Sequence, residues 1–128
     1  MRKKYIVDSG VQNGTEIRFL MQEEPQDMEV KAGGQLITDS DNLSFVYLMD
    51  SQEGYTYVQF PKIVWPLLAI SLSSDQDPHI AWGQADIQLT NFREELEMLI
   101  FNIEDNHNYG AEFVEAVEEI FKEQLSAQ

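Results

Sequence analysis

The chain has 128 residues, of which 23 are acidic and 8 are basic, giving a formal net charge of -15. A field of that sign repels nucleic-acid phosphates and anionic membrane surfaces, so direct nucleic-acid or membrane binding is not expected. The 43% hydrophobic fraction, with 7 Phe, excludes a disordered acidic chain. The absence of cysteine excludes disulfides and thiolate metal sites.

This length suits a single globular domain over residues 1–128 with one hydrophobic core. The basic start is not followed by the apolar run of a signal peptide. The longest apolar stretch, residues 63–72, is shorter than the roughly 20 residues that span a bilayer. Together with the lack of cysteine, these features predict a cytoplasmic protein.

The first part of the chain, residues 1–60, alternates apolar and polar side chains in short runs and is predicted to be rich in strands. Asn13-Gly14 lies between two such runs and favours a hairpin turn. A second hairpin is expected between residues 43–49 and 55–60. Gly33-Gly34 is expected to break another strand.

The middle of the chain predicts one helix over residues 61–72, which Pro66 should kink or shorten. Two short strands are expected within residues 79–89. The fold class that follows is α+β, a mainly antiparallel sheet built from hairpins and covered by this middle helix and two C-terminal helices.

The two C-terminal helices are predicted over residues 91–104 and 110–125, where apolar residues recur at helical spacing. Thr90 or Asn91 is expected to cap the first helix, with Glu94 completing a capping box.

The C-terminal third also carries much of the charge, because residues 85–128 hold eleven acidic residues against two basic ones. On the last helix, Glu112, Glu115 and Glu119 are expected to face solvent. This acidic surface is the candidate contact for a basic protein partner.

Three aromatic residues are further candidates for partner binding: Tyr55, Tyr57 and Trp82. Tyr and Trp dominate the hot spots of protein interfaces. The alternative is that these side chains belong to the core or to cross-strand pairs that stabilise hairpins.

Asp39 and Asp41 form the sharpest polar cluster, in the segment Asp39-Ser40-Asp41-Asn42. The segment begins like a calcium-binding loop of the EF-hand type. However, Leu43 occupies the position of an oxygen ligand, and Ser44 occupies the position where the turn needs glycine. A looser Mg²⁺ or Ca²⁺ site shared with other carboxylates remains open. The alternative is a turn whose Asp and Asn side chains bond the local backbone.

Catalytic patterns are lacking in the sequence. His79 and His107 are the only histidines, and neither has a partner at a metal-ligand spacing. The pairs Glu94-Glu95 and Glu118-Glu119 are consecutive in predicted helices, so their carboxylates diverge. We therefore expect no catalytic residue, no cofactor and no enzymatic activity.

Four segments in the same order form a recognisable pattern. They are residues 36–42, residues 45–47, residues 55–58 leading to Trp65, and residues 92–113. The first segment contains Asp39-Ser40-Asp41, and the last contains Asn108-Tyr109-Gly110. This pattern resembles the YjbL-like family of small acidic proteins from Bacillus- and Staphylococcus-type bacteria. The resemblance covers roughly two thirds of the chain and implies a bacterial cytoplasmic setting without an assigned activity.

The function these observations favour is that of a non-catalytic adaptor or regulator that binds a basic protein surface. One alternative is a nucleic-acid mimic that inhibits a DNA- or RNA-binding protein. A second is a divalent-metal-binding protein, or a metal-assisted enzyme, that uses Asp39 and Asp41. A third is an acidic surface that only keeps the protein soluble. The partner's identity and the oligomeric state are left open.

Overall fold

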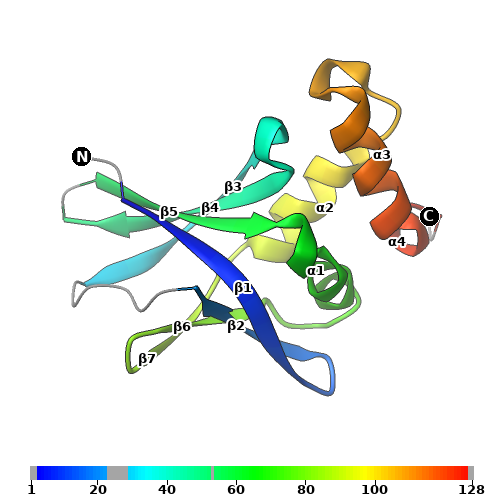
Figure 1. The fold of residues 1–128 in the computed structure, drawn as a ribbon. Helices are drawn as coiled ribbons and strands as arrows, with labels where there is room; N and C mark the ends of the chain where they lie inside the picture. Colours follow the sequence, from blue (N-terminus) through cyan, green and yellow to red (C-terminus); the bar gives the residue numbers. More distant parts are fainter. Residues whose placement is uncertain (1–2, 23–28, 53, 127–128) are drawn as a thin grey trace.

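The computed structural model describes residues 3–22, 29–52 and 54–126. It is an α+β fold in which one curled sheet meets a group of helices (Figure 1). The sheet has seven strands in the order β3-β4-β5-β1-β2-β6-β7. Their bounds are β1 Lys3–Asn13, β2 Glu16–Met21, β3 Val30–Asp39, β4 Ser44–Ser51, β5 Gly54–Pro61, β6 His79–Trp82 and β7 Ala85–Gln88.

The sheet is mixed, which corrects the prediction of a mainly antiparallel one. Both predicted hairpins are present, with Asn13 opposite Glu16 in one and Ser51 opposite Gly54 in the other. However, β1 runs parallel to β5, and β2 runs parallel to β6. Hairpin signals are local in sequence, whereas these parallel pairs join strands that are distant along the chain, so the pattern did not reveal them.

Strand β1 connects the two halves of the sheet. Its first residues pair with β5, and the part from Val7 onward pairs with β2, with a shift of register between Val7 and Ser9. The sheet curls so far that Cα atoms of its two edge strands, β3 and β7, approach within 8 Å. The concave side of this partial barrel receives the core.

Strand β3 is continuous through Gly33-Gly34, where the sequence predicted a break. The register with β4 shifts between Ala32 and Gln35, so the two glycines form a bulge. A side chain at position 33 would clash with the neighbouring strand, because a Cβ there would lie 2.3 Å from the Leu48 carbonyl oxygen. Only glycine therefore fits at this position. Gly34 has a φ of 75°, which L side chains rarely adopt.

The described residues form four α-helices, not three, and Figure 1 shows them gathered at one side of the sheet. Their bounds are α1 Trp65–Leu72, α2 Phe92–Ile103, α3 Ala111–Ile120 and α4 Lys122–Ser126. The single helix predicted over 110–125 is divided at Phe121, whose φ of -99° and ψ of 22° leave helical geometry. Three short 3-10 turns also occur: η1 Ser40–Asn42, η2 Lys62–Val64 and η3 His107–Tyr109.

Pro66 begins the middle helix rather than kinking it. The segment 61–72 starts with the turn η2, and the α-helix begins only at Trp65. Pro66 therefore lies in the first helical turn. The missing backbone N–H of a proline costs little there, because the first N–H groups of a helix have no partner within the helix.

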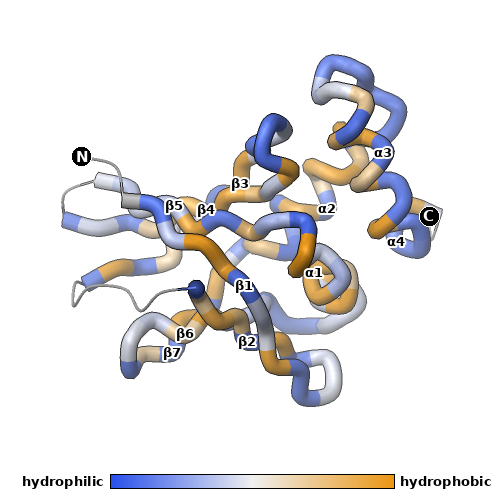
Figure 2. The backbone as a smooth tube through the Cα atoms, in the orientation of Figure 1, coloured by the Kyte–Doolittle hydropathy of each residue, from blue (hydrophilic) through white to orange (hydrophobic). Residues whose placement is uncertain are grey.

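The sheet and the helices share one core centred on Trp65, which is fully buried. Its ring lies 5.0 Å from that of Phe45 on β4, 5.6 Å from Phe113 on α3 and 6.0 Å from Phe121. Its indole N–H donates to the Phe60 carbonyl oxygen at 2.9 Å. Figure 2 shows apolar segments gathered at the centre, with the polar loop before α3 on the outside.

Candidate functional site

The start of α2 is tied to the sheet by a buried tyrosine. The Tyr47 hydroxyl donates to the Thr90 carbonyl oxygen at 2.6 Å and accepts from the Gly34 N–H at 2.9 Å. Burial raises the pKa of this hydroxyl above its ordinary value of 10.0. A third link joins the Leu36 N–H to Glu95 Oε1 at 3.1 Å. These bonds fix the helix relative to β3 and β4.

The α2 N-terminus is capped by Asp77, which the sequence did not predict. Asn91 holds the N-cap position with a φ of 63° and makes no side-chain cap. Asp77 instead accepts from the Asn91 N–H at 3.2 Å and the Arg93 N–H at 3.0 Å. The Arg93 guanidinium lies 3.4 Å from the same carboxylate and also donates to the carbonyl oxygens of Ser74 and Asp75. The predicted capping box with Glu94 is therefore wrong.

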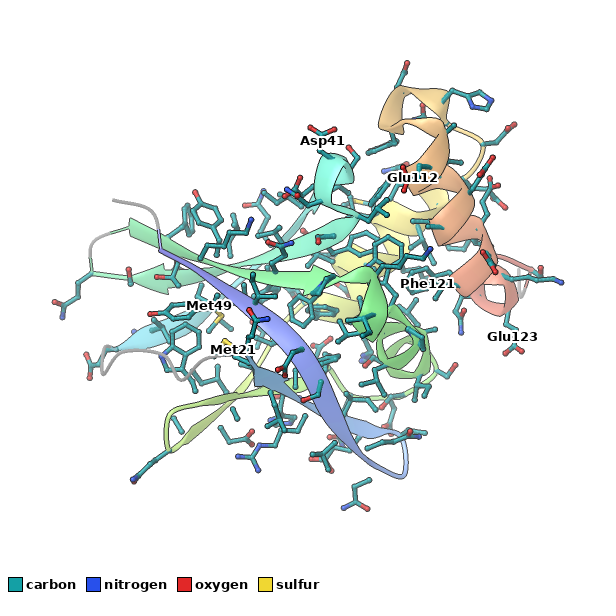
Figure 3. All side chains as sticks on the ribbon, in the orientation of Figure 1. Met21, Asp41, Met49, Glu112, Phe121 and Glu123 are labelled. Atoms are coloured by element: carbon teal, nitrogen blue, oxygen red, sulfur yellow. The ribbon has the colours of Figure 1, made fainter. Side chains whose placement is uncertain are left out.

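Glu112, Glu115 and Glu119 lie on one side of α3, because residues three and four apart are neighbours on a helix. We call these three residues the acidic face. All three are exposed, while Phe113, Val114, Ala116 and Val117 on the opposite side are buried. Figure 3 shows Glu112 on α3, and it shows Glu123 on α4 directed away from the body of the protein.

The acidic face is not neutralised within the part of the chain that the structure describes, since no ion pair reaches its three carboxylates. The neighbouring Glu118 has a structural contact instead, because its Oε2 accepts from the Asp105 N–H at 2.8 Å. That bond joins the α2–α3 connection to α3. The acidic face is thus free to attract cations on a helix whose position is fixed.

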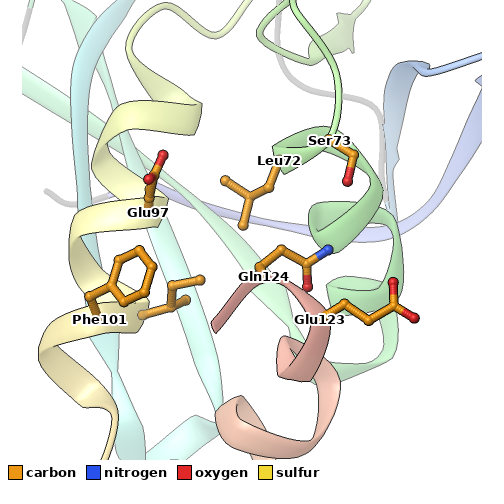
Figure 4. Close-up of a pocket in the computed structure, with 7 residues that line it drawn as sticks. Leu72, Ser73, Glu97, Phe101, Glu123 and Gln124 are labelled. Atoms are coloured by element: carbon orange, nitrogen blue, oxygen red, sulfur yellow. The ribbon is translucent and has the colours of Figure 1, made fainter. Parts of the chain in front are cut away.

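A groove of about 730 Å³ opens between α1, α2 and α4 (Figure 4). We call it the helical groove, and its lining residues are Leu72, Ser73, Glu97, Ile100, Phe101, Glu123 and Gln124. The sequence pattern did not reveal this groove, because three separate segments build it. One signal was present: Phe101 is a large apolar residue that does not share the helical spacing of Phe92, Leu96, Ile100 and Ile103.

The three aromatic candidates occupy different environments. Tyr55 on β5 is 50% exposed, and Tyr57 on the same strand is partly buried. Trp82 on β6 is only 5% exposed, and its ring packs edge-on against Tyr5 at 5.3 Å. The structure thus places Trp82 in the core and leaves Tyr55 as the exposed member of the set, some distance along the chain from the acidic face.

Asp39 and Asp41 lie in the turn η1 between β3 and β4. Asn42 Nδ2 donates to Asp39 Oδ2 at 2.8 Å, and the Ser44 hydroxyl donates to the Asn42 carbonyl oxygen at 2.9 Å. Asp41 is exposed at the tip of the turn (Figure 3). Over residues 3–22, 29–52 and 54–126, no group of three or more His, Asp or Glu side chains is arranged to hold a metal ion. The contacts present are those of a self-bonded polar turn.

No helix in the described part of the chain is long and apolar enough to cross a membrane.

A family model described as a family of unknown function, UPF0738, matches residues 5–121. The chain belongs to the UPF0738 family. A UPF0738 protein of Lysinibacillus sphaericus is 42% identical over 122 residues, which cover 95% of this chain and 96% of that protein. One from Bacillus cytotoxicus is 38% identical over 93 residues, covering 73% and 76%, and one from Bacillus cereus strain G9842 is 37% identical over the same length.

These UPF0738 relatives confirm the Bacillus-type setting that the sequence resemblance implied, while the YjbL-like label is not confirmed. The family match begins at Tyr5 and includes both hairpins and the acidic face. No solved structure matches the chain.

Proposed function

We propose that this UPF0738 protein is a non-catalytic cytoplasmic adaptor or regulator that binds a basic protein surface through the acidic face. The observation that carries the proposal is the position of Glu112, Glu115 and Glu119. They are exposed on one side of α3, and within the described residues no cation pairs with them. A basic partner would supply the missing counter-charges.

The packing of α3 supports this function, because a docking surface gains affinity when it is already ordered. Phe113 is buried against Trp65 and Phe45, so α3 is fixed to the core. Binding would then order only the three glutamate side chains and their partners. The net charge of -15 would also speed the approach of a basic protein.

The expected energy of the contact is modest. Exposed ion pairs contribute about 0.2–1 kcal/mol each, so three of them change affinity by about 3- to 140-fold. Salt screens such pairs over about 8 Å at physiological ionic strength. The complex should therefore weaken as salt is raised, and it should need apolar contacts in addition to charge.

Affinity purification with matched charge variants tests the proposal. The tagged chain would be used in cytoplasmic extract of its native bacterium at low and high salt. The test variant combines Glu112→Gln, Glu115→Gln and Glu119→Gln. The control combines Glu16→Gln, Glu29→Gln and Asp50→Asn, three exposed acids on the strand-rich part, which change the net charge equally.

At low salt, the natural chain and the control variant should both recover a basic protein, and the test variant should not. At high salt, the natural chain should no longer recover it. Recovery that is equal for both variants would contradict the proposal. A further experiment adds excess duplex DNA to the complex. Displacement of the partner by DNA would favour the nucleic-acid mimic instead.

A further inference from the structure

The helical groove has an apolar floor that the fold leaves partly open to solvent. Ile100 at its base is fully buried, whereas Leu72 and Phe101 are only partly buried. Figure 4 shows α2 on one side, with Glu97 and Phe101, and α1 and α4 on the other. A volume of about 730 Å³ lies within the range of about 300–1,000 Å³ typical of binding pockets.

The walls of the groove are fixed by contacts outside it. The Gln124 side-chain amide donates to the Ala69 carbonyl oxygen at 3.1 Å, which joins α4 to α1. Phe121 and Leu125 on either side of Gln124 are buried in the core. The groove is therefore present before any partner arrives, and binding need not create it.

The rims of the groove are negative on both sides. Glu97 on α2 and Glu123 on α4 are exposed, and within the described residues neither forms an ion pair. Arg93, one turn before Glu97, has its guanidinium bonded to Asp77 and to two loop carbonyls. The rims therefore favour an occupant with cations on both sides of an apolar group.

We propose that the helical groove receives an apolar side chain of a basic amphipathic protein segment, placed between Leu72, Ile100 and Phe101, while Lys or Arg residues flanking that side chain pair with Glu97 and Glu123. This inference rests on the proposed function, because it names the part of the basic partner that docks. A second copy of this chain is the wrong occupant, since each copy carries a net charge of -15 and would meet acidic rims.

The groove supplies what the acidic face lacks. Exposed ion pairs alone are weak, whereas burial of an apolar side chain contributes more to affinity. Glu123 on the groove rim follows Glu119 of the acidic face by four residues, across the break at Phe121. We expect the acidic face to attract a basic amphipathic segment and the groove to bind its apolar side chain.

The probe for this test is a synthetic helical peptide of about three turns, or about 11 residues, with Leu on one face and Lys elsewhere. Two matched peptides replace every Leu by Ala, or every Lys by Gln. Binding is followed by NMR of the ¹⁵N-labelled full chain at low salt. We expect the backbone amides of Leu72, Phe101 and Gln124 to shift with the first peptide and much less with the other two.

Variants of the full chain test the lining. Phe101→Ala should weaken binding of the Leu-Lys peptide about tenfold, and Met98→Ala on the same helix should leave it unchanged, because Met98 is 49% exposed and lies outside the groove. The double variant Glu97→Gln with Glu123→Gln alters only exposed charges. It should weaken binding with no loss of thermal stability, even if Phe101→Ala unfolds the protein.

Equal binding of the Leu-Lys and Ala-Lys peptides, or shifts confined to α3, would overturn the groove proposal. Shifts on α3 alone, lost with the Gln variant of the acidic face, would leave the proposed function standing without the groove. Shifts in the groove that persist in that variant would support the groove and count against the acidic face.

Discussion

Tyr47 on β4 and Thr90, two residues before α2, are joined by a 2.6 Å hydrogen bond from the tyrosine hydroxyl to the threonine carbonyl oxygen. The Tyr47 side chain is fully buried, and its oxygen also accepts from the bulge of β3 through the Gly34 N–H. This phenol is one of the links that hold the start of α2 against the sheet, together with the bond from the Leu36 N–H to Glu95. The same helix forms one wall of the helical groove.

The raised pKa of Tyr47 predicts a loss of stability at high pH. The unfolded chain releases this proton near pH 10, whereas the folded chain holds it to a higher pH, so the free energy of unfolding falls as pH rises from about 10 upward. Tyr47→Phe should lower the free energy of unfolding by about 1–3 kcal/mol at neutral pH. It should also remove the part of the high-pH decrease in stability that comes from the Tyr47 hydroxyl. Urea unfolding from about pH 8 to about pH 11 measures both. Identical pH slopes for the two proteins would contradict the assignment.

Asp77 is predicted to stabilise α2 from a distant loop. Asp77→Ala removes the acceptor of two helix N–H groups and the partner of Arg93, so we expect a loss of about 1–2 kcal/mol. Asp75→Ala is the control, because Asp75 is exposed and contacts Arg93 only through its backbone carbonyl. Thermal unfolding should show a clear decrease for the first variant and little for the second, and equal decreases would argue against a cap.

The two tryptophans are expected to respond differently to replacement by phenylalanine. Trp65→Phe loses the bond to the Phe60 carbonyl oxygen and leaves a cavity among three aromatic rings, a cost of about 2–3 kcal/mol. Trp82→Phe loses no hydrogen bond, since its buried indole N–H has no partner in the described structure, and should cost about 1 kcal/mol. Chemical unfolding of both variants decides this, and a larger cost at Trp82 would contradict the packing described.

Gly33→Ala tests the bulge in β3. The added methyl group would meet the Leu48 carbonyl oxygen at 2.3 Å, and moving that backbone should cost about 1–3 kcal/mol. Gly83→Ala is the comparison, because Gly83 has a φ of 60° but open space around it, so only the conformational cost of about 1 kcal/mol applies. Denaturant midpoints should rank Gly33→Ala as the less stable variant, and the reverse order would show that the strands can separate at this point.

The sequence predicted elements better than their assembly. The Asn13-Gly14 turn and the apolar stripe of α2 are local patterns, and the structure contains both the hairpin and the helix. The parallel pairing of β1 with β5 depends on core packing between distant segments, for which no local signal exists. Pro66 was misread because the proline rule depends on where the helix begins, and the turn η2 moved that start.

The same contrast applies to the candidate sites. Exposure of Glu112, Glu115 and Glu119 could be predicted, since helical periodicity alone separates them from Phe113 and Val117. The helical groove could not, because it requires α1 and α4 to lie beside α2. Asp77 was missed for a similar reason: it is 16 residues before Arg93, and only the folded loop brings its carboxylate to the helix end.

The bulge at Gly33-Gly34 also bears on self-association. Among the described strands, β3 and β7 stand at the two ends of the sheet order, and such edges can template intermolecular pairing. Because the register of β3 shifts at the bulge, a straight incoming strand could follow only half of its length. β7 offers just four residues. The bulge in β3 and the short length of β7 thus limit the span over which a second chain could add to either edge of the sheet.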